Sequence, residues 1–299
     1  MKIHATAILL VLTSLAGPAG AEAPPGDPWH VLDLPPELAE LVDREIGAVT
    51  SAPEARFERL VDFMHQTSGV DFRYQATPTH DLARTYAGGK GNCLSFTLLF
   101  IGLARHLGLD AQAREVRVRP NWESDNDLLK LITHVNVSVR MPGREAIVDF
   151  EPDAVRAMRL GSPFRGRVVS DQRALAHFHN NRAVEILAQG QLADARAWID
   201  QAVELDPEFV PGLNTRGVIL RRLGERNLAR ASFEQALALD PDNSLASANL
   251  TALDRPARSS GAAWLASLPS STAKPGASRD TDKFGPADWS PKGALKHPD

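Results

Sequence analysis

The 299-residue chain has a single cysteine, Cys93, so it can form neither an intrachain disulfide nor a four-cysteine zinc site. It also has no excess of basic residues: 33 Lys and Arg against 37 Asp and Glu give a formal charge of −4. Nucleic-acid binding needs a basic surface. Past the N-terminal region, no apolar run approaches the ~20 residues that cross a bilayer. We therefore expect no nucleic-acid partner, no membrane span and no cofactor.

Residues 1–21 have the pattern of an export signal. Lys2 supplies the charged end, Ala5–Ala16 is an apolar run, and Ala19–Ala21 has the small residues of a cleavage site. The alternative is an uncleaved anchor, for which the run is short. The pattern predicts a periplasmic or secreted protein. In such an oxidising compartment, an unpaired Cys93 is a liability unless it is buried or used.

The region after the signal is predicted to form helices. Residues 22–36 are rich in proline, and we expect them to be extended. Two helices are expected within 37–65, where Ser51 and Glu54 have the spacing of a capping box. Leu94–Leu107 is apolar on nearly every side, which is typical of a helix buried in the centre of a domain.

Two alternating runs, Thr133–Arg140 and Glu145–Phe150, flank a turn at Met141–Arg144 and predict a β-hairpin. One register places all the apolar side chains on one face, and a slip by one residue would break that arrangement. The expected pairs are Arg140 with Glu145, Val139 with Ala146, Val137 with Val148 and Val135 with Phe150. Helices followed by antiparallel strands predict an α+β domain over residues 37–160.

The other face of the hairpin carries polar residues. In the same register Asn136 lies opposite Asp149, and His134 is the next residue along that face, within reach of a carboxylate–imidazole hydrogen bond. A carboxylate that holds a histidine is the usual way to orient a general base. The alternative is a solvated sheet face on which His134 and Asp149 have no catalytic role.

Cys93 stands at the start of the apolar helix. It follows a glycine-rich segment, and Asn92 before it suits the N-cap position. A thiol at a helix N-terminus lies near unpaired N–H groups and the positive end of the helix dipole, which favour the thiolate form. The alternative is a small buried residue of the core, a common role of a lone cysteine.

The motif Gly91-Asn92-Cys93, then Leu107–Ala111 after the helix, then a strand, resembles the transglutaminase-like family within the papain-like fold. The resemblance covers about residues 70–155. It implies a catalytic triad of Cys93, His134 and Asp149, with the Cys93 backbone N–H as a candidate oxyanion donor. One departure is the Val135-Asn136-Val137 segment after His134, where many members of the family carry an aromatic residue.

Residues 176–254 contain an internal repeat of 34 residues. The matching positions are Asn180 and Asn214, Ala183 and Gly217, Gly190 and Gly224, Ala195 and Ala229, Ile199 and Phe233, and Pro207 and Pro241. The pattern resembles the tetratricopeptide repeat, with two units and a capping helix, although His179 and Leu213 stand at its early aromatic position. Two units are few for independent stability, so we expect them to pack on the first domain. Residues 161–175 are expected to be a linker and 255–299 a disordered tail.

The first helices of the two repeats would line a concave face. Asparagines there suit the backbone of an extended peptide, and arginines suit its carboxylates. The candidate partner-binding residues are Asn180, Arg182, Asn214, Arg216 and Arg221. The alternative is that these residues are solvated surface.

Two other groups of residues are weaker candidates. His177 and His179 are two apart on a helix and do not share a face, which argues against a metal site. Asp125–Asp127 form an acidic loop without the complete calcium-binding pattern. Trp122 could line a substrate groove or anchor a loop. We therefore expect no metal ligands.

Together these observations predict an exported cysteine-dependent acyl-transfer enzyme, either a peptidase or amidase or of transglutaminase type. Its substrate would be a peptide or carboxamide, and the repeats would recruit a protein partner. The alternative is a catalytically silent transglutaminase-like scaffold that acts as a protein–protein interaction module.

Overall fold

The computed structural model describes residues 24, 26–64, 72–116, 122–125, 128–131, 134–150 and 166–254. The predicted signal peptide and C-terminal tail lie outside these residues, as do the side chains of Trp122 and Asp125–Asp127. Within the described part, no helix has both the length and the apolar character needed to cross a bilayer.

Helices predominate in the described residues up to and including the predicted buried helix. The elements are η1 (Pro28–Leu32), α1 (Pro36–Val42), η2 (Asp43–Gly47), α2 (Pro53–Asp62), α3 (Leu82–Gly88) and α4 (Cys93–His106). Residues 73–74 (β1) and 90–91 (β2) form a short parallel pair. α4 is the predicted apolar helix, and it begins one residue earlier than the apolar run, at the cysteine.

Two local predictions for this region are wrong. Residues 22–36 are not extended throughout, because Asp27 caps a 3₁₀ turn, η1, which buries Val31 in the core. The capping box at Ser51 does not form either. Pro53 occupies the first turn of α2, so Ala52 becomes the N-cap and no side chain caps the helix.

The central sheet has four strands in the order β7-β6-β3-β8, all antiparallel. The strands are β3 (Asp110–Val116), β6 (His134–Met141), β7 (Arg144–Val148) and β8 (Gly166–Val168). The register of the β6–β7 hairpin is the predicted one at Val137–Val148, Val139–Ala146 and Arg140–Glu145. A further pair, β4 (Trp122–Asp125) and β5 (Leu128–Leu131), is separate from this sheet.

The prediction of a linker at 161–175 is wrong for residues 166–175, and residues 161–165 lie outside the described part. β8 adds to the edge of β3, and the Val169 N–H extends that pairing to the carbonyl of Ala113. The first repeat helix, α6 (Asp171–Ala188), begins two residues later, with Ser170 as its N-cap. A three-residue edge strand is too short to show an alternating pattern, so the sequence carried no signal for it.

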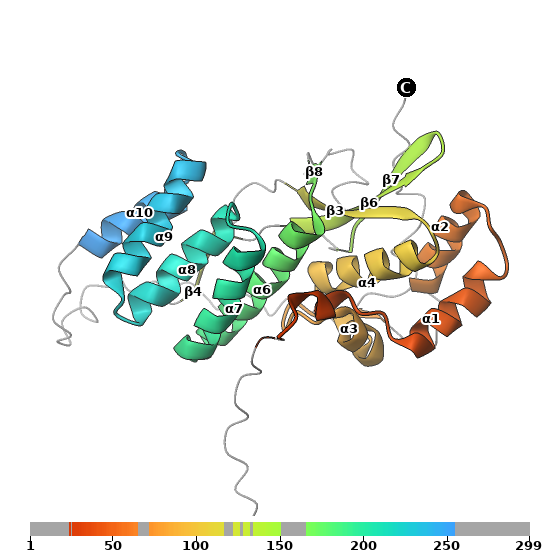
Figure 1. Cartoon of the computed structure of the whole chain (residues 1–299), viewed down its shortest axis with the longest axis horizontal. Helices are drawn as coiled ribbons and strands as arrows, with labels where there is room; N and C mark the ends of the chain where they lie inside the picture. Colours follow the sequence, from red (N-terminus) through yellow and green to blue (C-terminus); the bar gives the residue numbers. More distant parts are fainter. Residues whose placement is uncertain are drawn as a thin grey trace, which may run out of the picture.

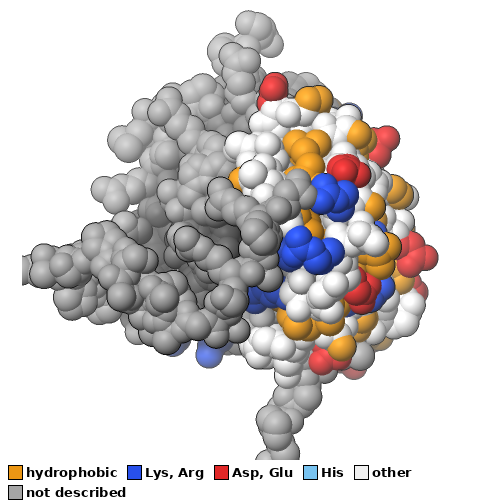
Figure 2. All heavy atoms as spheres, turned by 90° about the vertical axis from the view of Figure 1, so that its left-hand side faces the viewer, with side chains coloured by type: hydrophobic (Ala, Val, Ile, Leu, Met, Phe, Trp, Pro, Cys, Tyr) orange, Lys and Arg blue, Asp and Glu red, His pale blue; other side chains and the backbone are white. Residues whose placement is uncertain are grey.

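The second half consists of paired helices that extend away from the sheet (Figure 1). After α6 these are α7 (Leu192–Leu205), α8 (Val210–Arg222), α9 (Arg226–Leu239) and α10 (Ser244–Asp254). The small repeat positions allow close packing of the helices: a Cβ on Gly217 would lie 2.3 Å from the Phe233 ring, so α8 and α9 approach closely because a glycine stands there. The face at the α9–α10 end mixes hydrophobic, basic and acidic side chains (Figure 2).

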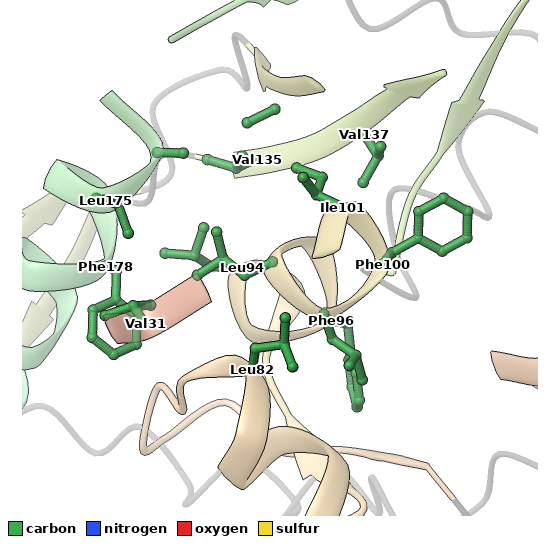
Figure 3. Close-up of a cluster of buried hydrophobic side chains, with 14 of the residues drawn as sticks. Val31, Leu82, Leu94, Phe96, Phe100, Ile101, Val135, Val137, Leu175 and Phe178 are labelled. Atoms are coloured by element: carbon green, nitrogen blue, oxygen red, sulfur yellow. The ribbon is translucent and has the colours of Figure 1, made fainter. Parts of the chain in front are cut away.

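One hydrophobic core connects the two halves. α4 lies against the apolar face of the sheet, and the Thr97 hydroxyl donates to the Val135 carbonyl at 3.3 Å. Side chains of η1, α4, β6 and α6 meet in this cluster (Figure 3). Its labelled members include Val31, Leu94, Val135, Leu175 and Phe178. The predicted packing of the repeats on the first domain is therefore confirmed.

Polar contacts reinforce this interface along the length of α6. Arg105 at the end of α4 donates two hydrogen bonds to the carboxylate of Asp171, at 2.7 and 2.8 Å. His177 lies 2.8 Å from Glu115 of β3. Near the C-terminal end of α6, Glu185 accepts from the backbone and the hydroxyl of Thr79, both at 2.8 Å.

Candidate active site

The turn before α4 places Cys93 at the first position of the helix. Asn92 is the N-cap, as predicted, and its side-chain oxygen accepts from the Ser95 N–H at 3.0 Å. A Cβ on Gly91 would lie 2.6 Å from the Ser95 Cβ, so this approach needs a glycine. Cys93 is a free thiol and is half-buried.

His134 and Asp149 meet on the polar face of the hairpin. His134 Nε2 lies 2.8 and 2.7 Å from the two carboxylate oxygens of Asp149, and both side chains are buried. The period of two along each strand explains the arrangement, because Val135 and Val137 point into the core while His134 and Asn136 point to the other face. The solvated surface pair considered as an alternative is thus not what forms.

Both Asp149 and Cys93 affect the protonation of His134. Burial lowers the pKa of His134, but hydrogen bonds to Asp149 and Cys93 and the charges of both outweigh it and raise that pKa to about 10. Of the predicted triad, the structure pairs His134 with Asp149 directly, while Cys93 acts on the imidazole through its effect on the pKa.

His134 is expected to remain an imidazolium at pH 8, where an unperturbed imidazole of pKa 6.5 is neutral. Because the folded pKa is raised, protonated His134 contributes stability that is complete below about pH 6.5. That contribution is lost as the pH rises through about 10. The ¹⁵N chemical shifts of the His134 ring, followed from pH 5 to 11, report the titration directly. A midpoint near 6.5 would contradict the expectation.

Asn136 is a site residue whose role the sequence did not show. It is fully buried, and its amide donates to Asp149 Oδ2 at 2.9 Å, so the carboxylate is held from two sides. Arg114 of β3 pairs with Asn136 across the sheet, and its charge interacts with that of Asp149. The register placed Asn136 opposite Asp149, which was the available signal.

The predicted partner-binding residues of the repeats are less free than expected. Asn214 is buried, and its oxygen accepts from Asn249 of α10 at 2.9 Å. Arg182 donates to Glu185 at 2.7 Å, and Arg216 donates to Asp200 at 2.7 Å. Asn180 is buried too, and Arg221 also makes an interaction within the described chain. Neighbouring helices supply the partners of Asn214 and Arg216, and Arg182 is paired within α6, while peptide binding by these residues stays a prediction.

The two histidines of α6 are structural. His177 lies against Glu115 and against the Phe209 ring. His179 is buried between Phe178 and Trp198, and burial lowers its pKa to about 4. Among the described residues, no group of three or more His, Cys, Asp or Glu side chains could hold a metal ion.

Comparison with known protein families gives two matches. Residues 42–150 match the transglutaminase-like superfamily, and residues 210–243 match the tetratricopeptide repeat. A comparison with curated proteins gave no match.

Solved structures similar to this chain are tetratricopeptide-repeat domains. The second such domain of human RPAP3, in complex with an HSP70 peptide, is 30% identical, with a TM-score of 0.27 over 27% of this chain and 68% of that one. The Arabidopsis OM64 domain is 28% identical, with a TM-score of 0.26 over 26% and 65% of the two chains. The first domain of Spaghetti (RPAP3), bound to an HSP90 peptide, is 24% identical, with a TM-score of 0.26 over 26% and 62%. The chain thus spans about two thirds of the length of each.

Proposed function

Since the chain combines a transglutaminase-like domain with tetratricopeptide repeats, we propose that it is an exported cysteine-dependent acyl-transfer enzyme with the triad Cys93, His134 and Asp149. The observation that carries this proposal is the position of His134. Its ring is buried and lies 2.7 Å from the Asp149 carboxylate, and Cys93 as well as Asp149 raises the pKa of His134. A scaffold would not need to bury His134 and Asp149 and pair them in this way.

The arrangement supports acyl transfer in two steps. The Cys93 thiolate attacks the carbonyl carbon of a peptide or carboxamide, and the carbonyl electron pair moves onto the oxygen. The Cys93 backbone N–H, at the first turn of α4, is a candidate donor to that oxygen. As the tetrahedral species collapses, protonated His134 gives its proton to the leaving amine, and a thioester remains on Cys93.

The second step releases the acyl group. Neutral His134 takes a proton from water as the water oxygen attacks the thioester, and the C–S bond breaks to regenerate the thiolate and the imidazolium. An amine in place of water would give transamidation. We favour hydrolysis, which needs only water as the second substrate. Asp149 and Asn136 keep the imidazole oriented throughout.

The N-terminal pattern and the repeats define where and on what the enzyme would act. The apolar run before Ala21 supports export, and a periplasmic or extracellular location suggests peptide, protein or cell-wall amides as substrates. The repeat match supports recruitment of a protein partner by α6–α10.

A haloacetamide probe on a short peptide tests the proposal, because Cys93 is the sole thiol in the sequence. The native protein should be labelled faster than free cysteine at neutral pH. His134→Ala should slow labelling by about tenfold or more, as expected for loss of a proton-transfer partner. Intact mass gives the extent of labelling, and for exported material it also shows whether residues 1–21 are removed.

The matched control is His106→Ala, which changes an imidazole at the other end of α4 that lies against Asp43. It should leave labelling unchanged. A thiol that reacts only after denaturation would instead support the silent scaffold.

A further inference from the structure

A chain of hydrogen bonds outside the triad runs from the first repeat helix to the nucleophile turn. It starts at Glu185 of α6, whose Oε1 accepts from the Thr79 backbone N–H and from the Thr79 hydroxyl, both at 2.8 Å. The Thr79 hydroxyl oxygen in turn accepts from the Asn92 amide at 2.7 Å. Asn92 is the residue immediately before Cys93. A carboxylate of the repeats is therefore two hydrogen bonds away from the cap of the catalytic helix.

The chain continues into the first turn of α4. Asn92 Oδ1 accepts from both the backbone N–H and the hydroxyl of Ser95, at 3.0 and 3.1 Å. The Ser95 oxygen accepts from the backbone N–H of His80 at 2.9 Å, which returns the chain to the segment that carries Thr79. The result is a polar network that ties Asn92, just before Cys93, and Ser95, two residues after it, to the segment of Thr79 and His80.

Because the network is buried, its polar groups need hydrogen-bond partners within the protein. Thr79, Asn92 and Ser95 are all buried, so none of them can exchange a lost partner for bulk water. The Glu185 carboxylate is itself 10% exposed, and its other oxygen accepts from Arg182, which balances its charge. Removing the carboxylate would leave the Thr79 N–H and hydroxyl without their acceptor.

We infer that Glu185 is a positioning residue for Cys93: through Thr79 and Asn92, the first repeat helix fixes the turn that holds the nucleophile and its backbone N–H. The catalytic role given to this turn rests on the proposed function. The ordering of the turn by Glu185 does not depend on catalysis. It also makes the repeats a part of the catalytic unit in addition to any role in recruitment. Arg182, a predicted partner-binding residue, then serves to hold Glu185 in place.

Another contact of α6 provides the matched control. Asp171 also joins α6 to α4, but it binds Arg105 at the far end of that helix. Asp171→Ala therefore weakens the same interface without touching the network. Two variants interrupt the network: Glu185→Ala removes the acceptor, and Thr79→Val removes the hydroxyl link while it leaves the Glu185–Arg182 pair intact. Glu185→Gln restores an oxygen acceptor and should rescue part of the loss.

The first measurement is hydrogen exchange of the full chain, followed by mass spectrometry. Three amides are held by the network, those of Thr79, His80 and Ser95. In Glu185→Ala all three should exchange faster than in the parent protein, and in Thr79→Val, which keeps the bond from the residue 79 N–H to Glu185, those of His80 and Ser95 should. In Asp171→Ala none of them should. Unchanged exchange in both network variants would overturn the inference, and so would an equal increase in Asp171→Ala.

The second measurement is the alkylation rate of native Cys93 by iodoacetamide. Glu185→Ala and Thr79→Val should each lower the rate by about tenfold, within the range that a small misplacement of a reacting group produces. Asp171→Ala should match the parent, and Glu185→Gln should lie between. Should the parent thiol react no faster than free cysteine, the proposed function would fail while the exchange result still decides the ordering role. Should Glu185→Ala not fold, Thr79→Val decides both measurements.

Discussion

Asp149→Asn should slow the acylation of Cys93 by an activated ester by about 10²-fold or more, the range associated with a positioned proton-transfer group. The amide cannot accept from His134 Nε2 at both positions that the carboxylate now fills at 2.7 and 2.8 Å. The imidazolium would lose the buried negative charge that stabilises it. Single-turnover release of 4-nitrophenol from its acetate ester measures this step.

A control for the charge change is Asp110→Asn. Asp110 is an exposed carboxylate on β3 that pairs with Arg140 at the far end of the same sheet. It should acylate at the parent rate. Parent-like acylation by Asp149→Asn would show that the carboxylate does not orient His134 for catalysis.

Phe100→Ala should lower the free energy of unfolding by about 3–5 kcal/mol. Phe100 is fully buried in α4, with its ring 6.4 Å from that of Phe57 and 5.9 Å from that of Phe150. Phe150 follows Asp149 directly, so the cavity would lie beside the end of the β6–β7 hairpin. Urea unfolding followed by tryptophan fluorescence gives the difference.

The comparison for this variant is Leu228→Ala on α9, where the leucine is 48% exposed. It should change the stability by no more than about 0.5 kcal/mol. A loss below about 1 kcal/mol in Phe100→Ala would mean that the core collapses into the space or that the aromatic cluster contributes little.

Features set by neighbours in the sequence were predictable. The β6–β7 register followed from the alternation of valines, because a slip by one residue would expose the whole apolar face. Asn92 was placed at the start of α4 by its capping chemistry, and the repeat matched Gly217 to Ala183 and Phe233 to Ile199. These local rules brought Cys93, His134 and Asp149 into one hypothesis, and the structure pairs His134 with Asp149.

Features set by distant residues were not predictable. Glu185 and Thr79 are 106 positions apart, and neither residue type indicates such a contact. The partners of Asn214 and Arg216 lie on other helices, so the composition of one helix face could not show that these side chains were already engaged. A local rule also failed at Ser51. Because Pro53 takes the first turn of α2, the N-cap position falls on Ala52 and not on Ser51.

The position of α6 has a consequence for the evolution of the array. Repeat arrays gain and lose units by duplication, since an ordinary unit contacts only its neighbours. α6 is not an ordinary unit, because it pairs with α7 on one side and carries Asp171, His177 and Glu185 into the sheet domain on the other. Duplication or exchange of units beyond α7 would preserve every one of these contacts, whereas replacement of α6 would break them all. Natural variation in repeat number should therefore be found at the distal end of the array, with the first helix inherited together with the sheet domain.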